Sequence, residues 1–298
     1  MLPNFVIIGA QKSASTFIQH CLAEHPEVYM PSGETPFFES PDYEQLTISS
    51  LKTIFNGRTE KRVGIKRPSY IGKPEVPCRI QTHLPHAKLV AVLRNPIERA
   101  ISAYHHYING SFIPARNVEK GMRQLLDGAY QDKYMRSREI IEFGFYYKYL
   151  IQYQYFFERK QLLILLHENI LADRLSSVQT IYSFLDVDPH YVPKAINATP
   201  QAVLYNIPRL RFLSLRNQFI YYYNPNRTRL FMREDNPIGK AVADIIAAID
   251  DRLLSIVFKN KKPAVSAELK DRLFEIYRGD IERLQSYTGI DLSHWEPS

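Results

Sequence analysis

The sequence contains few cysteines, no internal repeats and no long uninterrupted apolar stretch. Two cysteines among 298 residues are too few for a disulfide framework, so we expect reduced thiols in a cytoplasmic protein. The longest apolar region, 241–258, contains four charged residues and therefore predicts an amphipathic helix rather than a membrane span. The first apolar run begins so close to Met1 that we expect neither a signal peptide nor a membrane anchor.

Acidic residues are absent from one long segment, 189–233, which nevertheless contains Lys194 and six arginines. The whole chain has a formal net charge of +7 and a pI near 9.2, which favours anionic ligands. Two interpretations of the segment remain open, a nucleic-acid surface and a lid over a small, multiply charged ligand. Because no nucleic-acid recognition motif is visible, we expect no nucleic-acid partner.

The residues 4–24 combine a strand, a turn of small residues and a helix. The apolar run 5–8 is too short for a helix and ends at Gly9, which predicts a buried parallel strand. Helical spacing of apolar residues begins at Thr16. Free N–H groups and the helix dipole point into such a turn, so it predicts a phosphate-binding loop.

This loop departs from the Walker pattern of ATP-binding proteins, in which lysine is the sixth residue after the first glycine. That position is Ser15 here, and the lysine, Lys12, is the third residue after Gly9. The loop is therefore predicted to hold one phosphate and to direct Lys12 toward a bridging or leaving oxygen. An ordinary turn with a solvent-facing lysine is the alternative. The predicted phosphate ligands are Ser13, Ala14, Ser15, Thr16 and Phe17.

A second apolar run, 63–66, ends in the adjacent cations Lys66 and Arg67. Open parallel sheets bind ligands just outside the carboxyl ends of their strands, so these cations are candidate ligand contacts. The loop 31–41 carries Glu34 next to two phenylalanines. Partial desolvation makes Glu34 a candidate general base, and a solvated turn glutamate is the alternative.

The run 88–93 is the clearest predicted strand and is followed by Arg94. Asn95 has the features of an N-cap and Pro96 those of a first helical residue. Ser102 lies two turns along this predicted helix. Arginine as a bidentate donor and serine as a neutral donor are suited to one doubly charged phosphate.

Further strands and helices alternate along the chain, which predicts an α/β fold. We expect a P-loop-like three-layer sandwich with a central parallel sheet of four to five strands flanked by helices. A single domain is expected, with a core (1–188), a basic lid or substrate region (189–240) and C-terminal helices (241–298). The aromatic residues of 140–157 are predicted to form core or to line a groove. The other predicted elements are a strand at 161–166 and helices at 118–129, 140–157, 175–185 and 266–284.

Several stretches resemble sulfotransferases that use 3′-phosphoadenosine 5′-phosphosulfate (PAPS). IIGAQKSAST followed by LAEHPEVYM is similar to the family's 5′-phosphosulfate loop and first helix, and VAVLRNPIERAISAYHHY is similar to its 3′-phosphate strand and helix. GETPFF resembles the acidic segment of the heparan-sulfate branch, and VGIKRPSY resembles the lysine-bearing second strand. The C-terminal part also resembles bacterial members.

The resemblance implies a role for each matching residue. Lys12 would neutralise the leaving phosphate, Lys66 would lie near the sulfuryl group, and Glu34 would act as general base. Arg94 and Ser102 would hold the 3′-phosphate. The chain has Lys-Arg-Pro where the family commonly has Lys-Thr-Pro, and it lacks the usual glycine-rich 3′ loop. The residues expected to replace that loop are Arg209 and Arg211.

The sequence therefore predicts a PAPS-dependent O-sulfotransferase that releases adenosine 3′,5′-bisphosphate (PAP) and needs no metal. The expected acceptor is the hydroxyl of a small-molecule natural product, as in secondary metabolite biosynthesis, and a carbohydrate hydroxyl is the alternative. Two other classes were weighed, a P-loop nucleotide kinase and a non-catalytic nucleic-acid binder. The displaced lysine argues against the kinase.

Overall fold

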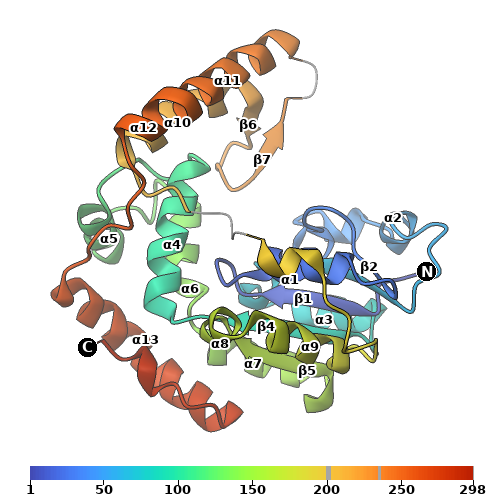
Figure 1. Cartoon of the computed structure of the whole chain (residues 1–298). Coiled ribbons are helices and arrows are strands. Elements are labelled where there is room, and N and C mark those ends of the chain that lie inside the picture. Colours follow the sequence, from blue (N-terminus) through green and yellow to red (C-terminus); the bar gives the residue numbers. More distant parts are fainter. Residues whose placement is uncertain (199–202, 234–235, 298) are drawn as a thin grey trace. The chain divides into compact units, whose positions relative to one another are not determined.

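Two compact units, each built from several parts of the chain, make up the protein (Figure 1). The computed structural model describes residues 1–198, 203–233 and 236–297. Unit 1 comprises residues 1–99, 145–200 and 278–292, and unit 2 comprises 100–144, 201–277 and 293–298. The helices α4 (Pro96–Asn109) and α13 (Ala267–Thr288) each begin in one unit and end in the other.

Unit 1 is organised around a five-stranded parallel sheet with the strand order β2-β3-β1-β4-β5. The predicted α/β fold with a central parallel sheet is confirmed. Four strands lie where the apolar runs predicted them, and the two-residue strand β2 was not predicted because it is too short to show periodicity. The strands are β1 (Phe5–Gly9), β2 (Val28–Tyr29), β3 (Arg62–Lys66), β4 (Lys88–Leu93) and β5 (Leu162–Leu166).

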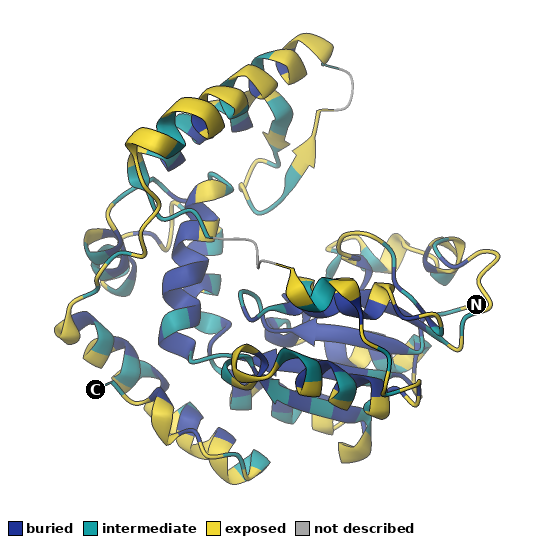
Figure 2. Ribbon diagram, viewed as in Figure 1, coloured by how far each residue is buried: buried dark blue, intermediate teal, exposed yellow. Residues whose placement is uncertain are grey.

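Helices flank this sheet on both faces (Figure 1). On one face, α1 (Ser15–Ala23) and α9 (Arg174–Phe184) share a buried apolar cluster with alternate residues of β1 and β4. The helices α3 (Val76–His83) and α7 (Tyr146–Gln154), which contact each other, lie on the other face (Figure 1). Burial is concentrated in the strands (Figure 2), as expected for a sheet covered on both sides.

Two glycines of the sheet are required by close packing. A Cβ atom on Gly64 of β3 would lie 2.1 Å from the ring of Phe5 on the neighbouring β1. A Cβ atom on Gly9 would lie 2.5 Å from the side chain of Ile71. Gly9 therefore allows the end of β1 to approach the segment that follows β3, so that the loops after these two strands lie close together.

The remaining helices of unit 1 are short. They connect strands or cover the ends of the sheet. They are α2 (Ile48–Thr53), α8 (His167–Ala172) and the 3₁₀ turns η1 (Phe37–Glu39), η2 (Tyr43–Gln45), η3 (Tyr70–Gly72), η5 (Arg159–Gln161) and η6 (Lys194–Asn197).

The prediction of one helix over 140–157 is wrong. The structure has two helices here, α6 (Glu139–Glu142) in unit 2 and α7 in unit 1, and the chain between them is not helical. Gly144 lies in this break, and a Cβ atom there would come within 2.7 Å of the ring of Tyr277. Glycine is also a poor helix former, so both local propensity and packing favour an interruption at this point.

Unit 2 is mainly helical, with one small antiparallel sheet of β6 (Tyr221–Tyr223) and β7 (Leu230–Met232). The long helices α10 and α11 pack against each other. The expected amphipathic helix at 241–258 begins earlier, as α11, and changes to a π-helical turn at Asp250. No helix among the described residues has the length and apolarity needed to cross a membrane. The elements are α5 (Val118–Leu126), η4 (Met135–Arg138), α10 (Ile207–Ile220), α11 (Pro237–Ile249), η7 (Asp250–Leu254), α12 (Ser255–Val257) and η8 (Ser293–Trp295).

Candidate active site

The loop between β1 and α1 has the backbone conformation of an anion-binding turn. Lys12 and Ala14 both have a φ of 68°, in the left-handed region. Alternation of left-handed and right-handed residues turns successive N–H groups toward one side, which forms a concave site for an anion. Ala14 is also the N-cap of α1 and provides no side-chain cap, so the first N–H groups of this helix are not satisfied by its N-cap residue.

Ser13, between these two residues, is fully buried, and its hydroxyl has no hydrogen-bond partner among the described residues. A buried hydroxyl without a partner is costly in a folded protein. Inside an anion-binding turn, this donor fits a phosphate oxygen. The loop therefore fits the 5′-phosphosulfate end of PAPS by its backbone and by Ser13.

Arg94 fixes the loop from the neighbouring strand. It follows β4, and its Nη1 donates to the carbonyl oxygen of Lys12 at 3.1 Å. Its own carbonyl accepts a hydrogen bond from the hydroxyl of Tyr146 at 2.8 Å. Arg94 also forms an ion pair with Glu98 at 3.5 Å, one turn into α4. The cation at the end of β4 thus lies beside the phosphate loop, as the ends of neighbouring parallel strands require.

The pKa of Lys12 is lowered from its ordinary value, first by burial and second by the positive charge of Arg94. The negative charge of Glu34 acts in the opposite direction and raises this pKa. A partly desolvated ammonium group next to a second cation is a strong attractor for an anion, because an anionic ligand relieves both penalties.

Lys66 is the last residue of β3 and is only 3% exposed. Its Nζ donates to Oγ1 of Thr16 at 3.0 Å, in the first turn of α1. Burial lowers the pKa of Lys66, Glu34 raises it, and Arg67 lowers it further. Glu34 therefore interacts electrostatically with both lysines of the site.

The loop that carries Glu34 is held against α1 and β3. Gln19 of α1 donates from Nε2 to the carbonyl oxygens of Pro31 and Gly33, both at 2.8 Å. The N–H of Thr35 donates to the carbonyl oxygen of Lys66 at 3.0 Å. These contacts bring together three residues that are far apart in the sequence, Lys12, Glu34 and Lys66.

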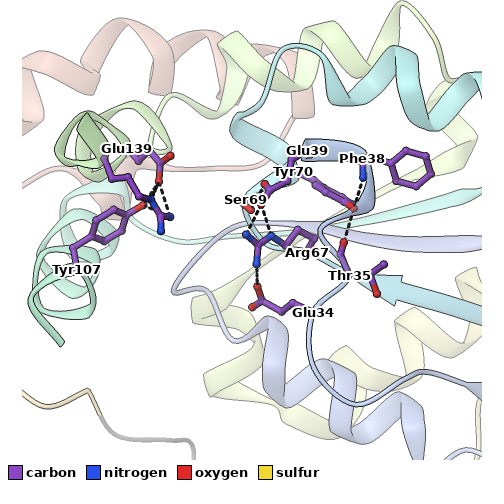
Figure 3. A network of polar contacts seen from close by, with 10 residues as sticks. Glu34, Thr35, Phe38, Glu39, Arg67, Ser69, Tyr70, Tyr107 and Glu139 are labelled. Carbon is purple, nitrogen blue, oxygen red and sulfur yellow. Dashed lines mark hydrogen bonds and ion pairs between the residues drawn. The ribbon is translucent and has the colours of Figure 1, made fainter. Parts of the chain in front are cut away.

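The carboxylate of Glu34 forms an ion pair with Arg67 at 2.6 Å (Figure 3). Arg67 also donates from Nε to Glu39 at 2.6 Å, and Ser69 donates to the second oxygen of Glu39 at 2.5 Å. Sequence reasoning did not select Glu39 or Ser69. The sequence did contain one signal for these partners, the arginine at position 67 in place of the threonine of Lys-Thr-Pro. An additional cation near a candidate base needs acidic partners.

Asn95 caps α4 as predicted, since its side-chain oxygen accepts the N–H groups of Ile97 at 3.0 Å and Glu98 at 3.3 Å. Ser102 lies on this helix, in the part assigned to unit 2, and is 1% exposed. Its hydroxyl has no partner among the described residues. Its contribution to a 3′-phosphate site remains a prediction.

Arg209 and Arg211 belong to α10 in unit 2. Arg209 donates from Nε and Nη2 to the two oxygens of Asp250, at 2.9 and 2.7 Å. Arg211 donates to the carbonyl oxygen of Ala115 at 3.2 Å. Their role at the 3′-phosphate stays a prediction.

The geometry can stabilise a transferred anionic group with fixed cations and can deprotonate a nearby hydroxyl. Lys12 and Lys66 supply positive charge, the loop supplies N–H donors, and Glu34 supplies a carboxylate. Within the described part of the chain, no three His, Cys, Asp or Glu side chains are grouped so that they could share a metal ion.

Two curated relatives are heparan sulfate enzymes. The chain is 30% identical over 202 residues to the human bifunctional heparan sulfate N-deacetylase/N-sulfotransferase 2. This alignment covers 63% of this chain and 22% of that protein. The chain is also 28% identical over 192 residues to the mouse heparan sulfate glucosamine 3-O-sulfotransferase 3A1. This second alignment covers 62% of this chain and 46% of that protein. The chain thus spans less than half the length of either relative.

Solved sulfotransferases share the fold. A sulfotransferase from Alicyclobacillus acidocaldarius aligns with 99% of both chains at a TM-score of 0.69 and 20% identity. The mouse sulfotransferase SULT7A1, complexed with PAP, aligns with 96% of this chain and 89% of that chain at a TM-score of 0.50 and 15% identity. The sequence profile of the sulfotransferase domain matches residues 2–218. The chain therefore belongs to the sulfotransferase family, the family of PAPS-dependent enzymes that its motifs predicted.

Proposed function

We propose that this protein transfers a sulfuryl group from PAPS to a hydroxyl group of an acceptor. The observation that carries the proposal is the meeting of Lys12, Lys66 and Glu34 beside the loop that follows β1. Glu34 acts electrostatically on both lysines, and Lys66 donates to the first turn of α1. The proposed general base, Glu34, is therefore close enough to Lys12 and Lys66 to act on both by its charge. These two lysines would face the phosphosulfate group.

PAPS supplies the activated sulfuryl group when it is bound. The backbone N–H groups of 13–17 and the hydroxyl of Ser13 would hold its 5′-phosphate. Arg94 and Ser102 would hold its 3′-phosphate. Each of these roles is suited to the residue, since Ser13 and Ser102 are buried hydroxyls without described partners and Arg94 is adjacent to the loop.

Lys12 would neutralise the negative charge that develops on the leaving phosphate, and Lys66 would stabilise charge near the sulfuryl group. Glu34 would take the proton of the acceptor hydroxyl. Holding both reactants next to these groups contributes a large part of the rate, because it replaces a bimolecular encounter by a fixed geometry.

The proposed acceptor is the hydroxyl of a small-molecule natural product. A carbohydrate hydroxyl is the second candidate, and it is favoured by the name of one relative, the heparan sulfate glucosamine 3-O-sulfotransferase 3A1. A panel of acceptors from both classes, incubated with purified protein and PAPS and analysed by mass spectrometry, decides between them through the mass gain of one sulfuryl group.

Binding and catalysis are tested separately. Calorimetry with PAP is expected to give a one-to-one complex, and lack of binding would overturn the proposal. Glu34→Gln is expected to bind PAP normally and to lose activity. Glu44→Gln is the matched control, because Glu44 is an exposed glutamate of the same region and makes no described side-chain hydrogen bond. Full activity in Glu34→Gln would remove the role of Glu34 as base.

A further inference from the structure

We infer that Arg67 is a positioning residue that fixes the Glu34 carboxylate and leaves one of its two oxygens, Oε1, to accept the proton of the acceptor hydroxyl. This inference rests on the proposed function. It concerns the position at which the chain departs from the commoner Lys-Thr-Pro pattern, and it gives that departure a mechanistic consequence.

The guanidinium of Arg67 contacts two carboxylates at once (Figure 3). Its Nη1 donates to Oε2 of Glu34 at 2.6 Å, while Nε and Nη2 both donate to Oε1 of Glu39. Burial acts to lower the pKa of Arg67, but the charges and hydrogen bonds of Glu39 and Glu34 together raise this pKa above its ordinary value. The guanidinium is therefore a permanent cation between two anions.

Arg67 is itself held in place by its backbone and by Glu39. Its backbone N–H donates to the carbonyl oxygen of Ile7 on β1 at 3.0 Å. The side chain of Glu39 is only 11% exposed, and its other oxygen, Oε2, accepts a hydrogen bond from Ser69 at 2.5 Å. Arg67 thus transmits the position of the sheet to Glu34, whose side chain is 39% exposed and belongs to a loop.

The contact with Arg67 distinguishes the two oxygens of Glu34. Oε2 accepts the hydrogen bond from Arg67, and no hydrogen bond to Oε1 occurs among the described residues. In the proposed reaction, the O–H bond of the acceptor breaks, its proton forms a new bond to Oε1, and the hydroxyl oxygen forms a bond to sulfur. The bond between sulfur and the bridging oxygen of PAPS breaks in the same step, and its electron pair leaves with PAP. Arg67 retains its proton throughout.

A lysine or a threonine cannot reproduce this arrangement. The planar guanidinium offers N–H groups in fixed directions and reaches both glutamates, whereas an ammonium group is a single point charge and a threonine carries no charge. Without Arg67, the half-exposed Glu34 side chain would sample several rotamers. A small misplacement of a catalytic group reduces the rate by about 100-fold.

The test compares Arg67→Met, Arg67→Lys and the wild type, with PAPS and an acceptor that the wild type sulfates. Arg67→Met is expected to lower kcat by about 10- to 100-fold, while the Kd of PAP and the KM of PAPS change by less than about 2-fold. Arg67→Lys is expected to be intermediate. Added methylguanidinium is expected to restore part of the activity of Arg67→Met and none of that of Glu34→Gln.

Arg58→Met is the matched control, because Arg58 is an exposed arginine whose ion pair is formed with Glu60 and not with a residue of the site. Glu39→Gln gives a second test if Arg67→Met folds poorly, since it weakens the support of Arg67 and leaves its contact with Glu34 in place. It is expected to lower kcat by less than Arg67→Met does.

The results separate the inference from the proposed function. An inactive wild type that does not bind PAP would contradict the proposed function. An active wild type with unchanged kcat in both Arg67→Met and Glu39→Gln would overturn the inference alone. A loss of PAP affinity equal to the loss of kcat in Arg67→Met would also overturn it, because it would assign Arg67 to binding rather than to positioning.

Discussion

Two arginine–carboxylate contacts, one in each unit, use the same chemistry for different purposes. In unit 2, Arg209 and Asp250 are 12% and 8% exposed at their side chains and satisfy each other through two hydrogen bonds. In unit 1, Arg67 and Glu34 are 26% and 39% exposed and share one hydrogen bond. The buried pair has no accessible carboxylate oxygen left for chemistry, whereas the exposed pair has.

The difference shows why an arginine in a basic segment is a weak indicator of function. Arg67 follows the strand β3 and Arg209 lies in the first turn of α10, and both were candidate site residues from the sequence. What separates them is the partner carboxylate, which lies 41 residues away for Arg209 and 33 residues away for Arg67. Loss of the buried pair should reduce stability, and loss of the exposed pair should reduce the rate.

The largest expected effect is on the stability contributed by the buried pair. Asp250→Ala removes the carboxylate and leaves the half-buried Arg209 guanidinium without this partner. Breaking a fully buried pair typically lowers the free energy of unfolding by about 3–5 kcal/mol, and for this half-buried pair we expect a loss of about 2–3 kcal/mol. Urea denaturation measures this change, and Asp251→Ala is the control because Asp251 is the exposed neighbour. A loss below about 1 kcal/mol would mean that the pair contributes little.

At Lys12 we expect a loss of rate without a loss of stability, the reverse of what we expect at Asp250. Lys12→Met should lower kcat by about 100- to 1,000-fold, because it removes a cation that stabilises developing charge in the transition state. Stability should be unchanged or higher, because burial already disfavours the charged form of Lys12. Steady-state kinetics and urea denaturation of the same variant test both statements. Lys52→Met, at an exposed lysine, should change neither quantity.

The pH dependence of stability gives a further way to compare the two units, through a buried histidine in unit 1. Burial, and secondly Arg94, lower the pKa of His167 in unit 1 from 6.5 to about 4. As the pH falls from about 6.5 to about 4, the unfolded chain takes up a proton on this histidine that the folded chain does not, so stability decreases in this window. Below about pH 4 both states are protonated and the loss is complete.

The variant His167→Gln lacks this proton uptake. Its free energy of unfolding should therefore fall less steeply between pH 6.5 and 4 than that of the wild type, as measured by urea denaturation at several pH values. Parallel slopes for the two proteins would show that His167 is not the group responsible.

The smallest effect concerns the backbone of the phosphate loop. Ala14 has a φ of 68°, which costs an L-residue about 1–2 kcal/mol and costs glycine nothing. Ala14→Gly should raise the free energy of unfolding by about 0.5 kcal/mol after the greater entropy of glycine in the unfolded chain is included. Ala14→Val should lower it, and thermal unfolding of both variants checks the sign. Destabilisation by Ala14→Gly would contradict this account.

The sheet was predictable because its strands are short apolar runs with clear ends. The runs at 5–8, 63–66, 88–93 and 161–166 agree with β1, β3, β4 and β5 to within one residue at each end. Periodicity alone predicted one helix over 140–157, because it does not register the break at Gly144, where low helix propensity and the close ring of Tyr277 both act. The roles assigned to the site residues stay predictions until they are tested.

The sequence by itself determined the parallel sheet, the turn after β1 and the family, because each depends on local patterns of apolar, small and basic residues. Only the tertiary structure decided which charges meet. The charge of Glu34 acts on Lys12 and Lys66, and its carboxylate contacts Arg67. Arg209 contacts Asp250 in the same way, and the partners in each case are far apart in the chain. Electrostatic partners depend on distance and burial in space, and neither quantity is encoded by spacing along the sequence.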